Sequence, residues 1–242
     1  MSFYRIEGGR PLSGSLSVQG AKNSVLPILA AAVLAPGQSV IHNCPDLSDV
    51  TAALEILRLL GCRTVREGDA VLIDASQLTG CGIPDRLMRE MRSSVIFLGA
   101  ILGRMGRAEL CAPGGCELGP RPIDLHLGAI RGLGGRITED GGGLRAEGAL
   151  RGADLVLSLP SVGATENAML AAVCAAGTTT ITNAAREPEI VDLQGFLRAI
   201  GAKVHGAGSS VITVEGGVPL HGGSYAVMGD RIVAATYLAA AA

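Results

Sequence analysis

The chain has no tryptophan, and aromatic residues make up only 2% of its 242 residues. Large rings therefore cannot dominate the core, which must be built from Ala, Val, Leu and Ile in thin layers with close backbone contacts. Hydrophobic residues account for 48% of the chain, and 35 residues are Gly. This composition argues against disorder and favours a repetitive α/β architecture.

Runs of one charge are also missing, and the formal net charge is −2. The sequence therefore gives no basis for nucleic-acid binding. The six cysteines include no CxxC pair and the four histidines are scattered, so zinc-ligand spacing is absent. A disulfide framework is not expected in a chain of this length. We expect no metal, no cofactor and a cytoplasmic location.

A long apolar segment is lacking too. The run at residues 25–35 is too short to cross a bilayer. More than twenty residues precede it, including Glu7 and several glycines, which is not the start of a secretory signal. The sequence predicts a buried helix here and no membrane span.

The chain does contain a threefold repeat. A basic residue, two further residues and a glycine recur with the glycines at Gly61, Gly134 and Gly201. A basic residue in the last turn followed by Gly is typical of a helix end. A β-rich segment with its own glycine turn follows each copy, at residues 64–74, 137–147 and 204–215. The pattern predicts one supersecondary unit repeated three times, although helix capping alone would also account for these glycines.

The first and third copies match further upstream. A helix opens at residues 20–23 and again at 163–167, and strands are predicted at residues 37–43 and 177–183. The middle copy carries a predicted helix at residues 85–103 and a strand at 108–112, and then departs from its siblings. A repeat that differs at one loop is where function is expected.

That loop, residues 113–125, carries Cys116 beside two glycines and among three prolines. The glycines allow the backbone to approach a ligand closely, and the prolines disfavour helix and sheet. Such a long loop is usually functional or disordered. A surface turn with an incidental cysteine is the alternative interpretation.

Three cations are candidates for binding an anion. Lys22, followed by Asn23, stands at a helix start, where backbone N–H groups favour negative charge. Arg92 lies inside an otherwise apolar predicted helix, and Arg121 stands between two prolines, where its guanidinium is suited to bidentate contacts. Lys22 could instead be solvated, and Arg92 could have an internal acidic partner. Together with Cys116 as acid or nucleophile, they suggest a cleft for a multiply anionic substrate.

Two weaker signals accompany these residues. Asp124 either belongs to that cleft or caps the following helix. The segment Ser161, Val162 and Gly163 precedes the helix of the third repeat and offers backbone donors.

Taken together, these residues resemble the enolpyruvyl transferase family along essentially the whole chain. The resemblance is carried by residues 20–24, 113–125, 160–167, 183–192 and 229–232. It implies an inside-out α/β barrel with one complete domain of three repeated α/β units plus the beginning of a second. The implied boundaries are residues 1–21 and 230–242 for the second, discontinuous domain and 22–229 for the complete one. Because family members are longer, we expect a partial enzyme with little activity alone.

The resemblance also implies a reaction: transfer of the enolpyruvyl group of phosphoenolpyruvate to the 3′-hydroxyl of UDP-N-acetylglucosamine, with release of phosphate. This is the first committed step of peptidoglycan synthesis, which connects it to cell wall biogenesis, cell shape, the cell cycle and cell division. The alternatives are a shikimate 3-phosphate transferase of the same family and a non-catalytic UDP-sugar-binding module.

The family's site residues carry over by position. Cys116, Lys22 and Arg121 would be catalytic, with Cys116 also the target of fosfomycin. Lys22, Asn23 and Arg121 would bind phosphoenolpyruvate. The UDP-sugar would be bound by Asn23, Arg92, Arg121, Pro122, Ile123, Asp124, Leu125, Ser161, Val162 and Gly163.

Overall fold

The computed structural model describes residues 3–5, 7–9, 13–91, 93–111, 123–140 and 142–241. The first repeated unit comprises α1 (Lys22–Ala32), β1 (Gln38–His42), α2 (Ser48–Leu59), β2 (Arg63–Glu67) and β3 (Ala70–Asp74). The second comprises β4 (Gly82–Ile83), α3 (Asp85–Glu90), the 3₁₀ helix η1 (Ser94–Ile96), α4 (Phe97–Met105), β5 (Arg107–Cys111), α5 (Asp124–Gly132), β6 (Arg136–Asp140) and β7 (Gly143–Glu147). The third comprises β8 (Asp154–Val156), α6 (Val162–Cys174), β9 (Gly177–Thr182), α7 (Pro188–Ala199), β10 (Lys203–His205) and β11 (Val211–Gly216). The chain then continues through β12 (Ser224–Ala226) into α8 (Arg231–Ala241).

The strands of the described residues form three four-stranded sheets with one topology. Their orders are β12-β1-β3-β2, β4-β5-β7-β6 and β8-β9-β11-β10. In each sheet the first two strands are parallel and the remaining pairs are antiparallel. Strand β12 completes the sheet of the first unit from far along the chain. This confirms the threefold repeat, although the short strands β4, β8 and β12 are not apparent from the sequence.

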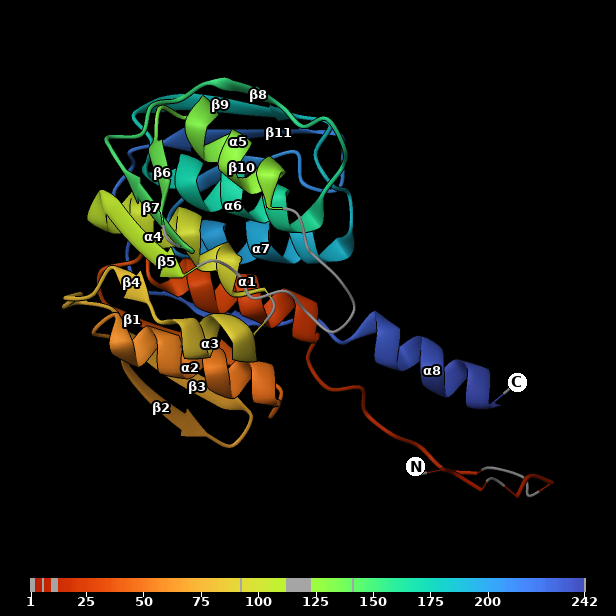
Figure 1. Cartoon of the computed structure of the whole chain (residues 1–242). Coiled ribbons are helices and arrows are strands. Elements are labelled where there is room, and N and C mark those ends of the chain that lie inside the picture. Colours follow the sequence, from red (N-terminus) through yellow and green to blue (C-terminus); the bar gives the residue numbers. More distant parts are fainter. Residues whose placement is uncertain are drawn as a thin grey trace.

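Apart from α8, which extends outward, the helices lie between the sheets (Figure 1). Every residue from Ser24 to Ala32 in α1 is buried, as is every residue from Ala164 to Val173 in α6. In α4 the buried run extends from Phe97 to Leu102. Helices inside and sheets outside confirm the predicted inside-out α/β class, although none of the three sheets closes into a barrel. Because small side chains line these helices, their backbones pack closely.

The three repeated glycines end helices as predicted. Gly61, Gly134 and Gly201 follow α2, α5 and α7 with φ of 103°, 89° and 97°. Each donates its N–H to the carbonyl of the arginine three residues earlier, at 2.9 to 3.0 Å. The next residue bonds back to the carbonyl five positions before it, at 2.9 Å. This is the Schellman arrangement, in which a left-handed residue satisfies the last carbonyls of a helix.

The predicted helix at residues 85–103 is wrong as a single element. The chain forms α3, then η1 and α4, with an interruption at Met91, whose φ of −119° and ψ of 106° are extended. The buried Ser94 donates its hydroxyl to the carbonyl of Met88 at 3.3 Å. Serine competes in this way for backbone groups that a continuous helix would use.

Both ends of the chain extend from the same side of the helices and sheets (Figure 1). The described residues before Gly20 form no helix or strand, and α8 has no buried residue. Helix α8 begins at Arg231, and its exposed side chains include Ile232, Tyr237 and Leu238. Within the described part of the chain, no helix has both the length and the hydropathy needed to cross a membrane.

Candidate functional site

The N-terminus of α1 lies where two distant parts of the chain meet. Gly20 forms an isolated antiparallel bridge with Gly229, and Ala21 donates its N–H to the carbonyl of Met228 at 2.8 Å. A Cβ added to Gly20 would lie 1.8 Å from the carbonyl oxygen of Asn43. The absence of a side chain at residue 20 is therefore what allows Lys22 to begin α1 at this crossing.

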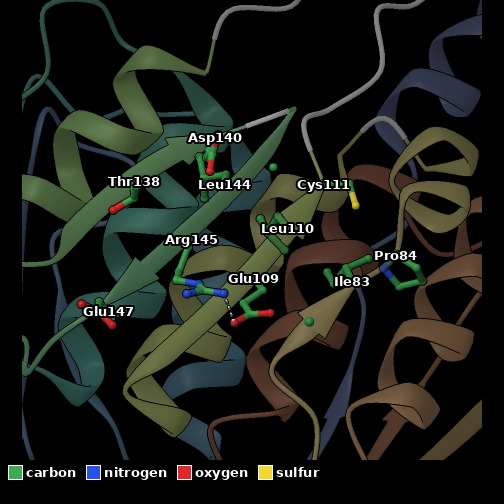
Figure 2. Close-up of a pocket in the computed structure, with 12 residues that line it drawn as sticks. Ile83, Pro84, Glu109, Leu110, Cys111, Thr138, Asp140, Leu144, Arg145 and Glu147 are labelled. Carbon is green, nitrogen blue, oxygen red and sulfur yellow. Dashed lines mark ion pairs between the residues drawn. The ribbon is translucent and has the colours of Figure 1, made fainter.

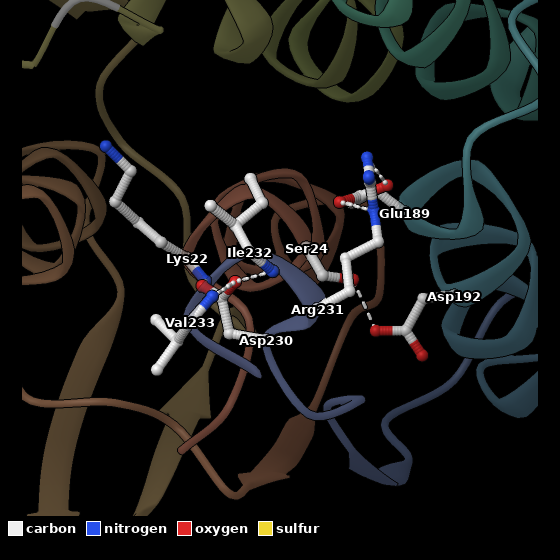
Figure 3. Close-up of polar contacts among 8 residues, drawn as sticks. All are labelled: Lys22, Ser24, Glu189, Asp192, Asp230, Arg231, Ile232 and Val233. Atoms are coloured by element: carbon white, nitrogen blue, oxygen red, sulfur yellow. Dashed lines mark hydrogen bonds and ion pairs between the residues drawn. The ribbon is translucent and has the colours of Figure 1, made fainter. Parts of the chain in front are cut away.

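Asp230 joins the starts of two helices (Figure 3). Its Oδ2 accepts a hydrogen bond from the backbone N of Lys22 at 3.2 Å. Its Oδ1 accepts from the N–H groups of Ile232 and Val233 at 2.9 and 3.2 Å. One carboxylate thus satisfies unpaired N–H groups of both α1 and α8, where negative charge is favoured by the helix dipoles.

The ammonium group of Lys22 forms an ion pair within the protein. Its Nζ lies 2.9 Å from Oδ2 of Asp49, in the first turn of α2, and the two side chains are 46% and 25% exposed. Asn23, the next predicted site residue, is exposed. The structure therefore places Lys22 and Asn23 together at an accessible helix end, with a carboxylate already beside the cation.

A buried network lies directly beneath. Ser24 donates its hydroxyl to Oδ2 of Asp192, which also accepts from the N–H of Met228 at 3.2 Å. Oδ1 of the same carboxylate accepts from the hydroxyl of Tyr225 at 2.7 Å. Burial, followed by the hydrogen bond to Asp192, raises the pKa of Tyr225. Asp192 of α7 thereby fixes the start of α1 and the segment that leads to α8.

The second cluster of predicted site residues is at the start of α6. Ser161 is the N-cap, and its Oγ accepts from the N–H of Ala164 at 3.4 Å. Val162 and Gly163 are the first helical residues, whose N–H groups have no partner within the helix. A Cβ on Gly163 would lie 2.8 Å from Cε1 of His126 in α5. The structure thus places the starts of α5 and α6 against each other.

His126 and Asn167 are site neighbours that sequence reasoning missed. The buried Asn167 accepts from the N–H of Gly99 at 2.7 Å and donates to the carbonyl of Val95 at 2.8 Å. Its amide nitrogen also lies 2.7 Å from Nδ1 of His126. Because the amide NH₂ only donates, Nδ1 acts as the acceptor. A polar residue within an otherwise alanine-rich helix was the signal in the sequence.

Residues 123–125 lead into α5. Ile123 and Leu125 are partly buried against the core, and Asp124 is exposed as the first helical residue. No side-chain capping hydrogen bond forms at this helix start within the described residues. The carboxylate of Asp124 nevertheless lies where the helix dipole favours negative charge.

The two clusters are connected through α7. Thr165 in the first turn of α6 accepts a hydrogen bond from the N–H of Ala185 at 3.0 Å. Ala185 lies in the connection that precedes α7, and α7 carries Asp192, which reaches Ser24. The start of α7 thus lies between those of α1 and α6.

Four predicted site residues, Arg92, Cys116, Arg121 and Pro122, lie outside the described residues. Their surroundings nevertheless confirm that the middle unit departs from the others. The connection between β5 and α5 comprises residues 112–123, whereas the equivalent connections are residues 43–47 and 183–187. The additional chain length in the middle unit contains Cys116.

A cavity of about 730 Å³ lies elsewhere, over the sheet of the second unit (Figure 2). It is lined by residues such as Ile83, Glu109, Cys111 and Arg145, and the last side chain forms a 3.2 Å ion pair with Glu109. None of the predicted site residues that the structure describes lines it.

Comparison with known proteins decides the family. Residues 6–242 match the family model described as EPSP synthase (3-phosphoshikimate 1-carboxyvinyltransferase). The chain belongs to this enolpyruvyl transferase family. It is 51% identical over 243 aligned residues to UDP-N-acetylglucosamine 1-carboxyvinyltransferase 2 of Caldanaerobacter subterraneus subsp. tengcongensis, covering 100% of this chain and 58% of the relative. It is 50% identical to UDP-N-acetylglucosamine 1-carboxyvinyltransferase 1 of Symbiobacterium thermophilum, covering 99% and 56%.

Solved structures of enolpyruvyl transferases share the fold. The enolpyruvyl transferase NikO from Streptomyces tendae has a TM-score of 0.85 and 26% identity, covering 97% of this chain and 56% of that one. EPSP synthase from Acinetobacter baumannii has a TM-score of 0.73 at 22% identity, covering 96% and 53%, and so supports the fold alone. The chain thus spans just over half the length of these enolpyruvyl transferases.

Proposed function

We propose that this chain takes part in transferring the enolpyruvyl group of phosphoenolpyruvate to the 3′-hydroxyl of UDP-N-acetylglucosamine, with release of phosphate. The observation that carries the proposal is identity of 46–51% along the whole chain to relatives named UDP-N-acetylglucosamine 1-carboxyvinyltransferase. The reaction would serve peptidoglycan synthesis, and through it cell wall biogenesis, cell shape and cell division. A cytoplasmic location and a role in the cell cycle belong to the same proposal.

Roles for individual residues follow from their positions. Lys22 and Arg121 hold the anionic groups of phosphoenolpyruvate. Cys116 donates a proton to the methylene carbon of phosphoenolpyruvate during the addition step. The exposed position of Lys22 at the start of α1 supports its proposed role in binding phosphoenolpyruvate. Cys116 is also the proposed point of attack by fosfomycin, an epoxide that a thiolate opens to form a thioether.

The UDP-sugar is proposed to lie across the starts of α5 and α6. The N–H groups at residues 162–163 favour its diphosphate, and Ser161 caps the same turn. Asn23, Arg92 and residues 121–125 complete this site in the proposal. The proposal also includes domain boundaries at residues 21/22 and 229/230. The bridge between Gly20 and Gly229, where the chain would pass from one domain to the other, supports these boundaries.

Phosphate release tests the reaction. The purified chain is mixed with phosphoenolpyruvate and either UDP-N-acetylglucosamine or shikimate 3-phosphate, and calorimetry measures the binding of each acceptor in parallel. We expect UDP-N-acetylglucosamine to bind and shikimate 3-phosphate not to bind, with slow turnover at most because the chain covers 58% of its relatives' length. Binding of shikimate 3-phosphate alone would replace the proposal with the EPSP synthase reaction.

A further inference from the structure

Lys22 is the cation that the proposed function assigns to phosphoenolpyruvate, yet its ammonium group is paired with a carboxylate of the protein. Nζ of Lys22 and Oδ2 of Asp49 are 2.9 Å apart. Asp49 lies in the first turn of α2, and its side chain is more buried than that of Lys22. The pair therefore lies at the surface with its cationic member on the more accessible side.

The neighbouring charges also disfavour an arriving anion. Oδ2 of Asp230 accepts from the backbone N of Lys22, so the N-terminus of α1 already has a carboxylate at one N–H group. Arg231, which follows Asp230 in the sequence, makes 3.0 and 3.2 Å contacts with Glu189, which is only 3% exposed (Figure 3). An anion that approaches Lys22 therefore meets Asp49 and Asp230 as like charges at close range.

We propose that Asp49 is an internal counter-ion of Lys22, which an anionic substrate must displace, and that Asp49 thereby sets the affinity and selectivity of this site for anions. The inference rests on the proposed role of Lys22. Asp49 acts through the lysine and is a positioning residue. A ligand that offers one weak contact does not offset the loss of the ion pair, whereas a ligand that carries both a phosphate and a carboxylate does. The pair thus selects for multiply charged substrates.

Asp49 has a second role that the test must separate from this one. An acidic residue in the first turn of a helix interacts favourably with the helix dipole. Loss of that interaction would change the stability of α2 and leave the chemistry of Lys22 unchanged. Asp49→Asn keeps the size of the side chain and removes its charge, and Asp49→Glu restores the charge.

Because the chain contains few lysines, the reactivity of the Lys22 amine can be measured directly by chemical labelling. Lys22 and Lys203 are its two lysines. Lys203 forms a 2.9 Å ion pair with Glu215 on the strands β10 and β11, and thus provides a matched control. Pyridoxal 5′-phosphate, an anionic aldehyde, condenses with a lysine amine with loss of water. Borohydride then reduces the imine to a secondary amine, which peptide mass spectrometry quantifies at each lysine.

We expect Asp49→Asn to raise labelling of Lys22 by about two- to fivefold, the range set by measured energies of solvent-accessible ion pairs. Labelling of Lys203 stays constant in this variant. The control variant Glu215→Gln changes the labelling of Lys203 alone. In Asp49→Glu, Lys22 is labelled to the same extent as in the parent protein. Phosphoenolpyruvate protects Lys22 from labelling, and it does so at a two- to fivefold lower concentration in Asp49→Asn, by the same estimate.

The outcomes separate the two proposals. Unchanged labelling and unchanged protection in Asp49→Asn would overturn the counter-ion role while leaving phosphoenolpyruvate binding at Lys22 intact. Failure of phosphoenolpyruvate to protect Lys22 in both proteins would overturn the substrate assignment and, with it, the counter-ion role. If circular dichroism shows that Asp49→Asn is unfolded, Asp49→Glu serves as the test. A two- to fivefold difference in the labelling of Lys22 between the parent protein and Asp49→Glu would then overturn the inference.

Discussion

Gly20 carries the closest steric constraint at the candidate site. Its hypothetical Cβ would lie 1.8 Å from the carbonyl oxygen of Asn43 and 3.3 Å from that residue's Cγ. The backbone carbonyl of Asn43 cannot move aside as a flexible side chain can, so the steric clash is not relieved. We therefore expect Gly20→Ala to lower the free energy of unfolding by about 3 kcal/mol. Gly128 in α5 is the control, because a Cβ there would meet nothing within 4 Å.

For Gly128→Ala we expect the opposite sign, a gain of roughly 0.5–1 kcal/mol, because alanine restricts the unfolded chain and favours a helix. Urea denaturation followed by circular dichroism measures both variants. Equal effects of the two substitutions would contradict the crossing at Gly20.

Tyr225 tests the buried network around Asp192. Its hydroxyl donates to Asp192 at 2.7 Å, and its ring meets Phe196 edge-on with centroids 6.0 Å apart. Tyr225→Phe keeps the ring contact and removes one of three donors, so we expect a loss of about 1–2 kcal/mol in the free energy of unfolding. Tyr237→Phe, on the exposed helix α8, serves as control and should change nothing measurable.

At the scale of elements, the first and third units share a cap that the middle unit cannot form. Asn43 and Asn183 follow β1 and β9 with φ of 53° and 59°. The amide of Asn43 donates to the carbonyl of Val227, and that of Asn183 to Leu157, both at 2.8 Å. The position after β5 holds Ala112, which has no side-chain donor. The side-chain hydrogen bond made by Asn43 and Asn183 therefore has no counterpart from residue 112 in the middle unit.

Substitution of Asn183 separates its two contributions. Asn183→Gly loses the hydrogen bond and retains easy access to positive φ, whereas Asn183→Ala loses both. We expect losses of about 1 and about 2 kcal/mol in the free energy of unfolding, again from urea denaturation. A larger loss for glycine than for alanine would show that the backbone conformation is not the constraint.

The elements that the sequence predicts are those with local causes. Helix ends at Gly61, Gly134 and Gly201 follow from left-handed glycines. The strands before Asn43 and Asn183 follow from short segments that contain β-branched residues and come after Gly37 or begin at Gly177. Strands β4, β8 and β12 contain two or three residues each and exist because they pair with distant partners. The break in residues 85–103 is accompanied by a hydrogen bond from the buried Ser94 to Met88, which no local pattern reveals.

The candidate site divides in the same way. Lys22 and the segment 161–163 were predicted from helix-start chemistry, and the structure confirms these positions at helix starts. The partners of Lys22, Asp49 and Asp230, come from other elements, as much as 208 residues away for Asp230. The same holds for Asp192, which bonds Ser24, and for His126, which bonds Asn167. Hydrophobic periodicity and capping rules contain no information on such pairs, so only the fold identifies them.

For the whole molecule, the buried thiol of Cys62 and the partly buried thiol of Cys174 predict sensitivity to alkali. Burial raises the pKa of Cys62 and of Cys174 from 9.0 to about 11. Burial raises the pKa of Cys44 as well. The unfolded chain therefore releases these protons first as the pH rises, so the free energy of unfolding is unaffected below about pH 8 and falls from pH 9 to pH 11.

Chemical denaturation at a series of pH values checks this expectation. A double variant, Cys62→Ala with Cys174→Ala, should show a smaller fall above pH 9, although its stability at pH 7 is lower. A constant free energy of unfolding from pH 8 to pH 10.5 in the parent protein would contradict the burial of these thiols.

The central claim concerns Cys116, the thiol of the lengthened connection in the middle unit. The most direct test is the alkylation rate of each cysteine by iodoacetamide at neutral pH, followed by peptide mass spectrometry with and without phosphoenolpyruvate and UDP-N-acetylglucosamine. We predict that Cys116 reacts fastest, that Cys44, Cys62 and Cys174 react slowest because burial disfavours their thiolates, and that the two substrates slow Cys116 alone. A rate at Cys116 that the substrates leave unchanged, or that is lower than that of the partly buried Cys81, would contradict the account.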